Sequence, residues 1–459
     1  MNDRDYVHFV GIGGSGMSAL ARILLARGAR VSGSDVRATP LIERLRAEGA
    51  RIAVGHRAEN IGDATLVVAS AAIAPDNPEL VAARARKTRV LGRGEMLAEV
   101  TVGCKTIAVA GTHGKTTTTA MIAAILEDAD LDPSVMIGGV RIDDETNARL
   151  GRGPWFVTES DESDGSFLHL RPTIAVVTNI ENDHVGSDDA MANLIAQFET
   201  FVSRVPPDGV AIVGIDSTPC ARIARGARWG VTTFGLADGA TVRGRDLRFT
   251  GLGSTFDVEI GGEQIGSFCL QVPGEMNVQN ALAAIAAARA VDVDVATIVE
   301  TLGKFSGVHR RFEILARGEQ MIVVDDYAHH PTAVAATIAA ARRYHDGPIV
   351  VAFQPHRYTR TAYLAANFGE ALAAADEVYL APIYAASEEP IDDVSERSIG
   401  AVLERHLTPV RYVGSVEALG DELRGNVKPG SLVLMLGAGS ITNVAHALAK
   451  SIAAPALAG

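Results

Sequence analysis

The stretch IAVAGTHGKTTTT, residues 107–119, combines the residue types that bind phosphate groups. Its small and apolar start predicts a buried strand, and Gly111 and Gly114 bound a turn that can aim backbone N–H groups at an anion. A helix beginning at Lys115 would add unpaired donors and the positive end of its dipole. Lys115 would reach the terminal phosphates of a nucleotide, and the Thr116 hydroxyl would bind Mg²⁺. The predicted nucleotide loop comprises Gly111, Thr112, His113, Gly114, Lys115, Thr116 and Thr117.

This loop is shorter than the usual phosphate-binding loop. The general pattern has a glycine five residues before Gly114, and that position is Val109 here. A tight strand-to-helix turn with a solvated lysine is the simpler alternative. The order of strand, glycine turn and helix favours phosphate binding.

Two acidic motifs follow predicted strands of the same region. The segment 159–167 reads ESDESDGSF and contains Glu159, and the segment 179–184 reads NIENDH and ends at His184. Parallel strands present their carboxyl ends at one edge of a sheet, so these groups should meet near the phosphate loop. Carboxylate and imidazole groups beside a triphosphate suit Mg²⁺. A single acid would more often be a solvated loop charge, whereas three strand ends at one edge favour a site. The acidic and histidine candidates are Glu159, Asp161, Glu162, Asp164, Asp183 and His184.

Two basic and histidine-rich motifs occur in the last third of the chain. DDYAHHP spans 325–331 and FQPHRYTRT spans 353–361, each directly after a predicted strand. Arg357 and Arg360 lie three residues apart, so on one helical turn they could form a fork for a carboxylate or phosphate. An isolated arginine pair is usually a salt-bridged surface feature. The position at a strand end beside His356 favours a functional role.

The N-terminal segment carries the glycine pattern of dinucleotide-binding proteins. Gly11, Gly13 and Gly16 follow the predicted strand Tyr6–Val10, and Asp35 ends the next strand at the separation expected for a ribose contact. A nicotinamide cofactor fits this pattern. The physical requirement is only a pyrophosphate at a helix N-terminus, which a nucleotide-sugar also supplies. The glycines could instead merely permit close packing of a helix on a strand.

The elements that position these motifs alternate between strand and helix along the chain. A length of 459 residues predicts about three domains, and the alternation predicts α/β units with parallel sheets. Residues 229–272 differ, because short alternating runs broken by Gly and Asp predict an antiparallel excursion. We expect a hinge within residues 91–104.

The charge, the cysteine content and the lack of long apolar runs exclude several classes of protein. A net charge of −13 argues against a nucleic acid or an anionic membrane as partner. The three cysteines lack paired spacing, so no disulfide framework or zinc site is expected. The N-terminus lacks the core of a signal peptide, and no apolar run is long enough to span a bilayer. We expect a cytoplasmic protein.

Taken together, the motifs resemble the Mur ligase family. GIGGSGMSALA with VSGSD, AGTHGKTTTT, ESDESDGSFL, TNIENDH, GVHRRFE, DDYAHHPT, FQPHRYTRT and YAASEEPI occur in the family's order over essentially the whole chain. The resemblance implies an α/β fold of three domains. These are an N-terminal Rossmann-like domain that binds UDP (1–97), a central P-loop ATPase domain (98–309) and a C-terminal Rossmann-like ligase domain (310–459).

The resemblance also implies an activity in peptidoglycan precursor synthesis. It is an ATP-dependent amide ligation that joins L-alanine to the lactyl carboxylate of UDP-N-acetylmuramate through an acyl phosphate, with ATP and Mg²⁺ as cofactors. The protein would be a monomer or homodimer. Three alternatives stay open: a recycling ligase that attaches a tripeptide to the same nucleotide-sugar, an NAD-dependent dehydrogenase fused to an NTPase, and a non-catalytic ATP-binding switch.

Residue roles follow from the matching motifs. The resemblance implies magnesium ligands Thr116, Glu159 and His184, and catalytic residues Lys115, His184, His329, Arg357 and Arg360. It implies further nucleotide contacts from Asn277, Asn280, Arg311 and Asp326. The implied substrate contacts are Gly11, Gly13, Gly14, Ser15, Gly16, Asp35, His56, Ser70, His329, His356, Arg357 and Arg360. His329 and His184 are both candidates for the base that deprotonates the amine.

Overall fold

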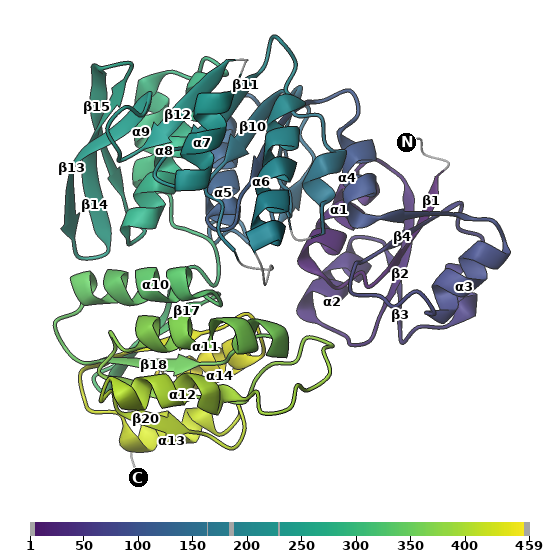
Figure 1. Cartoon of the computed structure of the whole chain (residues 1–459). Coiled ribbons are helices and arrows are strands. Elements are labelled where there is room, and N and C mark those ends of the chain that lie inside the picture. The colour runs from purple at the N-terminus through teal and green to yellow at the C-terminus, as the bar shows by residue number, and fades with distance from the viewer. Residues whose placement is uncertain (1–4, 163, 183–187, 228–229, 454–459) are drawn as a thin grey trace.

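The computed structural model describes residues 5–162, 164–182, 188–227 and 230–453. It contains three β-sheets, each covered by helices that come from the same part of the sequence (Figure 1). We refer to the N-terminal lobe (5–101), the central lobe (105–304) and the C-terminal lobe (313–453). These names describe the elements around each sheet, and the domain boundaries stated above remain a prediction.

The N-terminal lobe is built on a five-stranded parallel sheet of order β3-β2-β1-β4-β5. The chain runs outward from β1 to β3 on one side and then returns to β4 on the other, so the topological switch point lies between β1 and β4, beside the glycine turn that follows β1. Its strands are β1 (Tyr6–Val10), β2 (Arg30–Asp35), β3 (Arg51–Val54), β4 (Leu66–Ala69) and β5 (Arg89–Gly92). Its helices are α1 (Ser15–Ala26), α2 (Pro40–Ala47), the 3₁₀ turn η1 (Ala58–Ile61), α3 (Pro78–Ala85) and α4 (Arg93–Thr101).

The central lobe has a ten-stranded sheet in which β10, β6 and β9 are parallel neighbours. Its edge β13–β14–β15 is antiparallel, which confirms the excursion predicted within 229–272. The strands are β6 (Lys105–Ala110), β7 (Ser134–Met136), β8 (Ala148–Arg149), β9 (Trp155–Glu159), β10 (Ile174–Val177), β11 (Val210–Gly214), β12 (Val231–Gly235), β13 (Val242–Thr250), β14 (Gly253–Ile260) and β15 (Glu263–Leu270). The helices are α5 (Lys115–Asp128), η2 (Ser166–His169), α6 (Asp188–Ser203), α7 (Thr218–Gly226), α8 (Glu275–Arg289) and α9 (Val295–Lys304).

The C-terminal lobe has a six-stranded sheet of order β16-β17-β21-β18-β19-β20. All its neighbouring pairs are parallel except the edge pair β16–β17. The strands are β16 (Glu313–Arg317), β17 (Met321–Asp326), β18 (Ile349–Phe353), β19 (Glu377–Leu380), β20 (Val410–Tyr412) and β21 (Ser431–Leu436). The helices are α10 (Pro331–Tyr344), α11 (Tyr358–Leu372), α12 (Glu396–Arg405), α13 (Leu419–Asn426) and α14 (Ile441–Ala453). In Figure 1, α10 runs along the boundary with the central lobe.

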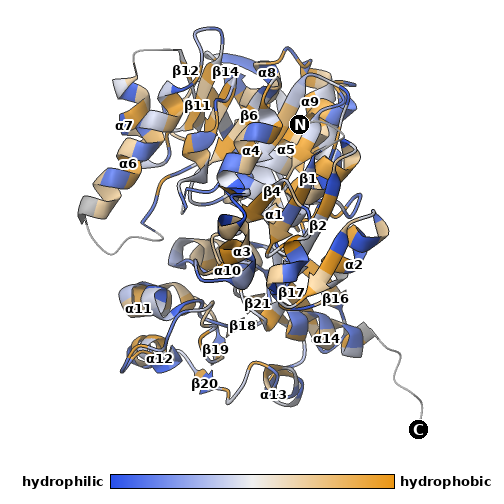
Figure 2. Cartoon of the chain, turned by 90° about the vertical axis from the view of Figure 1, so that its right-hand side faces the viewer, coloured by the Kyte–Doolittle hydropathy of each residue, from blue (hydrophilic) through white to orange (hydrophobic). Residues whose placement is uncertain are grey.

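Apolar residues on both faces of the sheets form the cores. Strands such as β18 and β21 are buried throughout, because helices cover both faces of a parallel sheet. Figure 2 shows hydrophobic residues concentrated on strands and on the inner sides of helices. Among the described residues, no helix is long and apolar enough to cross a membrane.

The segment expected to contain a hinge forms the end of β5 and the whole of α4. Met96, Leu97 and Val100 of α4 are fully buried, in an apolar cluster that continues into one face of the central lobe. A Cβ on Gly94 would overlap Ser166, so α4 and η2 approach each other closely. Gly94 therefore serves packing, whereas Gly103 has φ +83° and no heavy atom within 4 Å of a Cβ built on it.

Candidate nucleotide and substrate site

The phosphate loop connects the buried strand β6 to helix α5. Val109 is fully buried within β6, which explains why the loop is shorter than the general pattern: the turn begins at Gly111. Gly111 and Gly114 have φ values of +134° and +83°, where residues with a Cβ are strained. A Cβ on Gly111 would overlap Thr178 Oγ1, and one on Gly114 would overlap Asn280 Oδ1. Both glycines are therefore required by conformation and by space.

The backbone of the loop is held by Asn179, which follows β10. The N–H of Thr112 donates to the Asn179 carbonyl oxygen at 2.9 Å, and the N–H of His113 donates to Asn179 Oδ1 at 2.8 Å. The expectation that the turn aims its N–H groups at an anion is therefore wrong for these two residues. Thr118 is the first residue of α5 whose N–H donates a backbone hydrogen bond, to the Gly114 carbonyl oxygen at 2.9 Å. The amides at the helix start remain the candidate anion donors.

Lys115 forms an ion pair with Glu162. Its Nζ lies 2.7 Å from Glu162 Oε2 and donates to the Gly111 carbonyl at 2.5 Å. Burial disfavours the ammonium, but the charges of Glu162 and Asp161 outweigh it and raise the pKa of Lys115. Burial also raises the pKa of Glu162, against the effect of Lys115. Lys115 is therefore a charged group held over the loop by a buried carboxyl.

The four acids predicted at the end of β9 have separate environments. Glu162 bonds Lys115, whereas Asp161 and Asp164 lie 3.7 Å and 2.8 Å from Arg93 Nη2 at the start of α4. Glu159 Oε2 is buried and has no hydrogen-bond partner among the described residues.

The strip formed by Gly138 and Gly139 brings two predicted metal ligands together. A Cβ on Gly138 would overlap Glu159 Oε1, and one on Gly139 would lie 3.0 Å from Thr116 Cγ2. A buried carboxylate oxygen without a partner among the described residues, on the same glycine strip as a phosphate-loop threonine, fits the oxygen-ligand preference of Mg²⁺. Their role as ligands stays a prediction.

Residues from the two other predicted nucleotide segments reach the loop. Asn280 accepts a hydrogen bond from Thr118 Oγ1 at 3.2 Å and donates to Asn277 Oδ1 at 3.1 Å. Arg311 is on the connection to the C-terminal lobe, and its Nη2 donates to Thr116 Oγ1 at 3.4 Å. These contacts place the predicted adenine and phosphate contacts around one loop.

Asp326 ends β17 and is almost fully buried. Burial raises its pKa to about 6, although Arg311 and the N–H groups of Phe312 and Ala328 favour the charged form. Arg310 and Phe312 on the preceding turn have positive φ values of +62° and +49°, the kind of backbone strain that is concentrated at functional sites.

The N-terminal predictions converge at the carboxyl edge of the first sheet. Gly11 has φ +82°, and Ser70 Cβ would lie 3.2 Å from a Cβ there. The N–H of Gly13 donates to Asp35 Oδ2 at 2.8 Å, so this carboxylate already stabilises the turn. Gly14 caps α1 without a side-chain acceptor, and Ser15 is exposed, so this helix start is accessible to an anion. His56 approaches the same edge through a 2.9 Å hydrogen bond between its Nδ1 and Ser34 Oγ.

Three of the residues predicted in the C-terminal lobe form one cluster. The ring centroids of His329 and His356 are 6.0 Å apart, and His356 Nδ1 lies 3.3 Å from Arg360 Nη1. The predicted arginine fork on one helical turn is wrong. Arg357 precedes α11 with φ +71° and is exposed, whereas Arg360 is inside the helix and buried.

Comparison with known proteins assigns the chain. Three models match it: "Mur ligase family, catalytic domain" at residues 6–103, "Mur ligase middle domain" at 155–288 and "Mur ligase, glutamate ligase domain" at 310–439. The UDP-N-acetylmuramate–L-alanine ligase of Geotalea uraniireducens is 44% identical over 97% of this chain and 98% of its own length. The chain belongs to the Mur ligase family. This confirms the resemblance and the three-part α/β fold.

Two solved Mur ligase structures resemble the whole chain. The UDP-N-acetylmuramate–alanine ligase of Thermotoga maritima is 31% identical, has a TM-score of 0.84 and is matched over 97% of this chain and 98% of that one. A murein peptide ligase of Psychrobacter arcticus is 25% identical, has a TM-score of 0.75 and is matched over 99% of this chain and all of that one.

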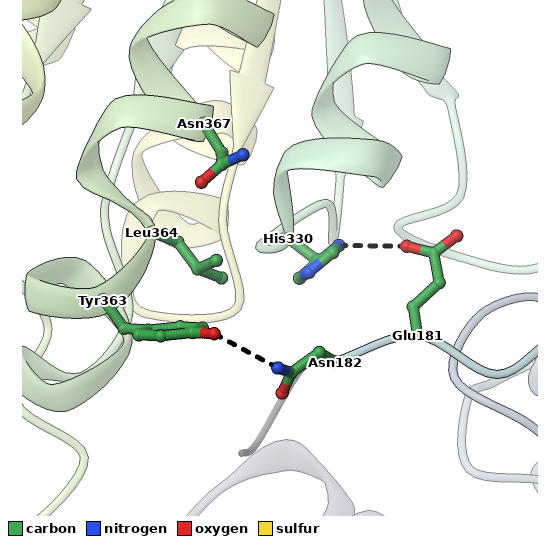
Figure 3. A pocket seen from close by; sticks show the side chains of 6 residues that line it. All are labelled: Glu181, Asn182, His330, Tyr363, Leu364 and Asn367. Atoms are coloured by element: carbon green, nitrogen blue, oxygen red, sulfur yellow. Dashed lines mark hydrogen bonds and ion pairs between the residues drawn. The ribbon is translucent and has the colours of Figure 1, made fainter. Parts of the chain in front are cut away.

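A cavity of about 500 Å³ opens between the central and C-terminal lobes of this Mur ligase (Figure 3). Figure 3 shows the side chains of Glu181 and Asn182 facing those of His330 and Tyr363 across it. Asn182 Nδ2 donates to Tyr363 Oη at 3.2 Å. None of its lining residues is among the predicted site residues. Glu181, Asn182 and His330 belong to recognised motifs, whereas the lining residues of α11 lie beyond the motif that ends at Thr361. The cavity is lined by Glu181, Asn182, His330, Tyr363, Leu364 and Asn367.

Two other contacts were not predicted individually. Glu162 was noted only as a member of an acidic run, and its proximity to Lys115 depends on the neighbouring ends of β6 and β9. Arg93 packs against Gly16 and pairs with Asp164, so it connects the glycine turn to the acidic motif. Asp183 and His184 lie outside the described residues, so the position predicted for His184 beside the metal is untested.

Proposed function

We propose that this Mur ligase joins L-alanine to the lactyl carboxylate of UDP-N-acetylmuramate in the cytoplasm, with conversion of ATP to ADP and phosphate. The observation that carries the proposal is the meeting of Lys115, Glu159 and Arg311 around one phosphate loop, with a cavity at the adjoining lobe boundary. The near full-length similarity to ligases of that name supports the choice of substrates.

In the first step, the lactyl carboxylate attacks the γ-phosphorus of ATP, and the bond to the β,γ-bridging oxygen breaks. The amides at the start of α5 and the Lys115 ammonium stabilise the charge on the transferred group. Lys115 is oriented for this role by Glu162, which restricts the ammonium to the mouth of the loop. Mg²⁺, held by Thr116, Glu159 and His184, would neutralise phosphate charge.

In the second step, the alanine amine attacks the acyl phosphate and phosphate leaves. The amine must be neutral, so a base has to accept a proton. His329 Nδ1 lies 2.8 Å from the Tyr327 carbonyl oxygen, which can only accept, so the neutral ring carries its proton on Nδ1 and its lone pair on Nε2. This tautomer makes His329 suitable as the base. Arg360 and the exposed Arg357 would bind the amino-acid and acceptor carboxylates.

The arrangement of the lobes suits a reactive acyl phosphate. Water would hydrolyse this intermediate, so the reaction needs a cavity that closes around both substrates. The cavity between the central and C-terminal lobes is bounded by groups from both, which supports closure by movement of the C-terminal lobe. We also propose the domain boundaries 1–97, 98–309 and 310–459, and a monomer or homodimer.

Phosphate release tests the proposal directly. With ATP, Mg²⁺ and UDP-N-acetylmuramate present, release should require L-alanine and should yield the alanyl product by mass spectrometry. Strict dependence on a tripeptide would instead identify the recycling ligase. Consumption of NADH would identify the dehydrogenase, and ATP turnover that is independent of any amino acid would favour the switch protein.

A further inference from the structure

Three side chains from distant parts of the sequence converge beside the cavity. His113 comes from the phosphate loop, Glu181 follows β10, and His330 is the N-cap residue of α10. His113 Nε2 lies 3.3 Å from Glu181 Oε2, and His330 Nδ1 lies 3.6 Å from the same oxygen. Figure 3 shows His330 and Glu181 pointing toward each other across the lobe boundary. All three potential ligand atoms lie within 4.8 Å of one another.

These separations match the edges of a metal coordination tetrahedron. Zinc binds imidazole nitrogen and carboxylate oxygen at about 2.0–2.2 Å, so two ligand atoms of a tetrahedral site are about 3.4 Å apart. The two measured separations, 3.3 Å and 3.6 Å, lie close to that value. The third separation, between the two histidines, is at most 4.8 Å. His330 Nδ1 also accepts a long hydrogen bond from the Thr332 N–H at 3.4 Å, which a bound ion would replace.

The cluster is buried and held together by charge. The His113 side chain is nine-tenths buried, and its Nε2 forms an ion pair with Glu181 without a well-aligned hydrogen bond among the described residues. An ion between the two groups would satisfy this buried nitrogen. Thr332 Oγ1 donates to Glu181 Oε2 at 2.6 Å, an outer-shell contact of the kind that orients metal-binding carboxylates.

The ligand types select a class of metal. Two imidazoles and one carboxylate form the donor set of many zinc sites, in which a fourth position is left for water or another ligand. Mg²⁺ prefers oxygen ligands in octahedral geometry and would bind this set poorly. The cluster therefore differs in chemistry from the oxygen-rich position predicted for Mg²⁺ at Thr116 and Glu159.

We propose that His113, Glu181 and His330 form a site for a zinc-class transition-metal ion that ties the phosphate loop to the start of α10. Because the ligands come from both lobes, an ion bound there would hold the C-terminal lobe against the central lobe. The inference goes beyond the proposed ligation activity. It can be tested without nucleotide or substrate, so its failure would leave the proposed ligase function unaffected.

Cobalt spectroscopy is the primary test. Co²⁺ is added to the full-length protein in excess Mg²⁺, without nucleotide, and visible spectra are recorded. We expect the intense bands of tetrahedral Co²⁺ to saturate at one ion per chain, and Zn²⁺ to abolish them. Hydrogen exchange should slow at the start of α10 when Zn²⁺ is bound, because the ion links this turn to the phosphate loop.

Variants assign the site to these residues. Glu181→Gln and His330→Asn should each weaken Zn²⁺ binding at least tenfold by calorimetry, and asparagine keeps a good N-cap for α10. Thr332→Val should weaken it about tenfold through loss of the outer-shell contact. His345→Gln, at the other end of the same helix, should leave affinity unchanged and is the matched control. Thermal melts in EDTA verify that each variant is folded.

Several outcomes would overturn the proposal. An octahedral Co²⁺ spectrum, or displacement of the ion by Mg²⁺, would show that no nitrogen-rich tetrahedral site forms. Zn²⁺ binding that survives Glu181→Gln and His330→Asn would place the ion elsewhere. Loss of binding in Glu159→Gln, with normal binding in the two cluster variants, would assign it to the predicted magnesium position.

Discussion

A buried glutamate in the N-terminal lobe offers a quantitative test of how the candidate substrate edge is held. Glu79, near the start of α3, has a side chain with no solvent exposure. It accepts hydrogen bonds from Ser34 Oγ at 2.5 Å, from Asn60 Nδ2 at 2.5 Å and from the Arg57 N–H at 3.3 Å. The perturbation is Glu79→Gln, which keeps the shape but removes the charge and one acceptor oxygen.

The expected magnitude follows from the pKa of this carboxyl. Burial by itself would raise the pKa of Glu79, but hydrogen bonds from His8, Ser34 and Asn60 outweigh it and lower the pKa from 4.5 to about 2. A shift of 2.5 units corresponds to about 3 kcal/mol at 1.36 kcal/mol per unit. Since the folded-state pKa is depressed, this stability is fully present above pH 4.5 and is lost as the pH falls toward 2.

Native-state hydrogen exchange of peptides from β1 and β4 reports the opening free energy of this lobe. At pH 7 we expect Glu79→Gln to lower it by about 3 kcal/mol, and at pH 3 by about 1 kcal/mol, because linkage has by then removed about 2 kcal/mol from the wild type. Glu59→Gln is the control, because Glu59 is exposed on the neighbouring η1 and should change stability by less than about 0.5 kcal/mol. A difference below about 1 kcal/mol that does not vary with pH would refute the assigned role.

Three further predictions concern the phosphate loop. Lys115→Ala should lower turnover at least about a hundredfold in the phosphate-release assay, because it removes a charged donor to the transferred group, whereas the exposed Lys304→Ala should not; near-normal ligation by the first variant would contradict the role. Gly114→Ala should raise the KM for ATP about tenfold, since left-handed backbone costs about 1–2 kcal/mol with a Cβ, and an unchanged KM would count against the loop geometry. Glu159→Gln should raise the Mg²⁺ concentration for half-maximal activity at least about tenfold in a magnesium titration; an unshifted titration would exclude Glu159 as a ligand.

Much of the fold could be predicted because the local signals are strong. β1 spans the predicted residues and α5 begins at Lys115 as predicted, since buried apolar runs define strands and a glycine turn precedes the helix start. The antiparallel excursion was also recognised from its broken, alternating pattern. The edge strands β7, β8 and β16 were missed, because two to five residues at a sheet edge carry too little periodicity.

The sequence predicted the parts of the site that depend on local backbone geometry, but not the contacts between distant elements. Lys115 and Gly114 belong to one short motif whose function depends on local backbone geometry, so spacing was sufficient. The arginine fork failed because Arg357 adopts φ +71° before the helix, and helical spacing cannot reveal a left-handed residue. Arg93 and Glu162 acquire their partners from other elements, which no local pattern specifies.

The sequence alone determined the order of the chemical motifs, the α/β class and the family, because each depends on residue types within a short window. Tertiary structure decided which of these groups meet. Parallel pairing of β10, β6 and β9 brings three strand ends to one edge, and packing of α10 at the lobe boundary brings His330 to Glu181. Glu181 and His330 are more than a hundred positions apart in the sequence. Only long-range packing of sheets and helices brings such residues into contact.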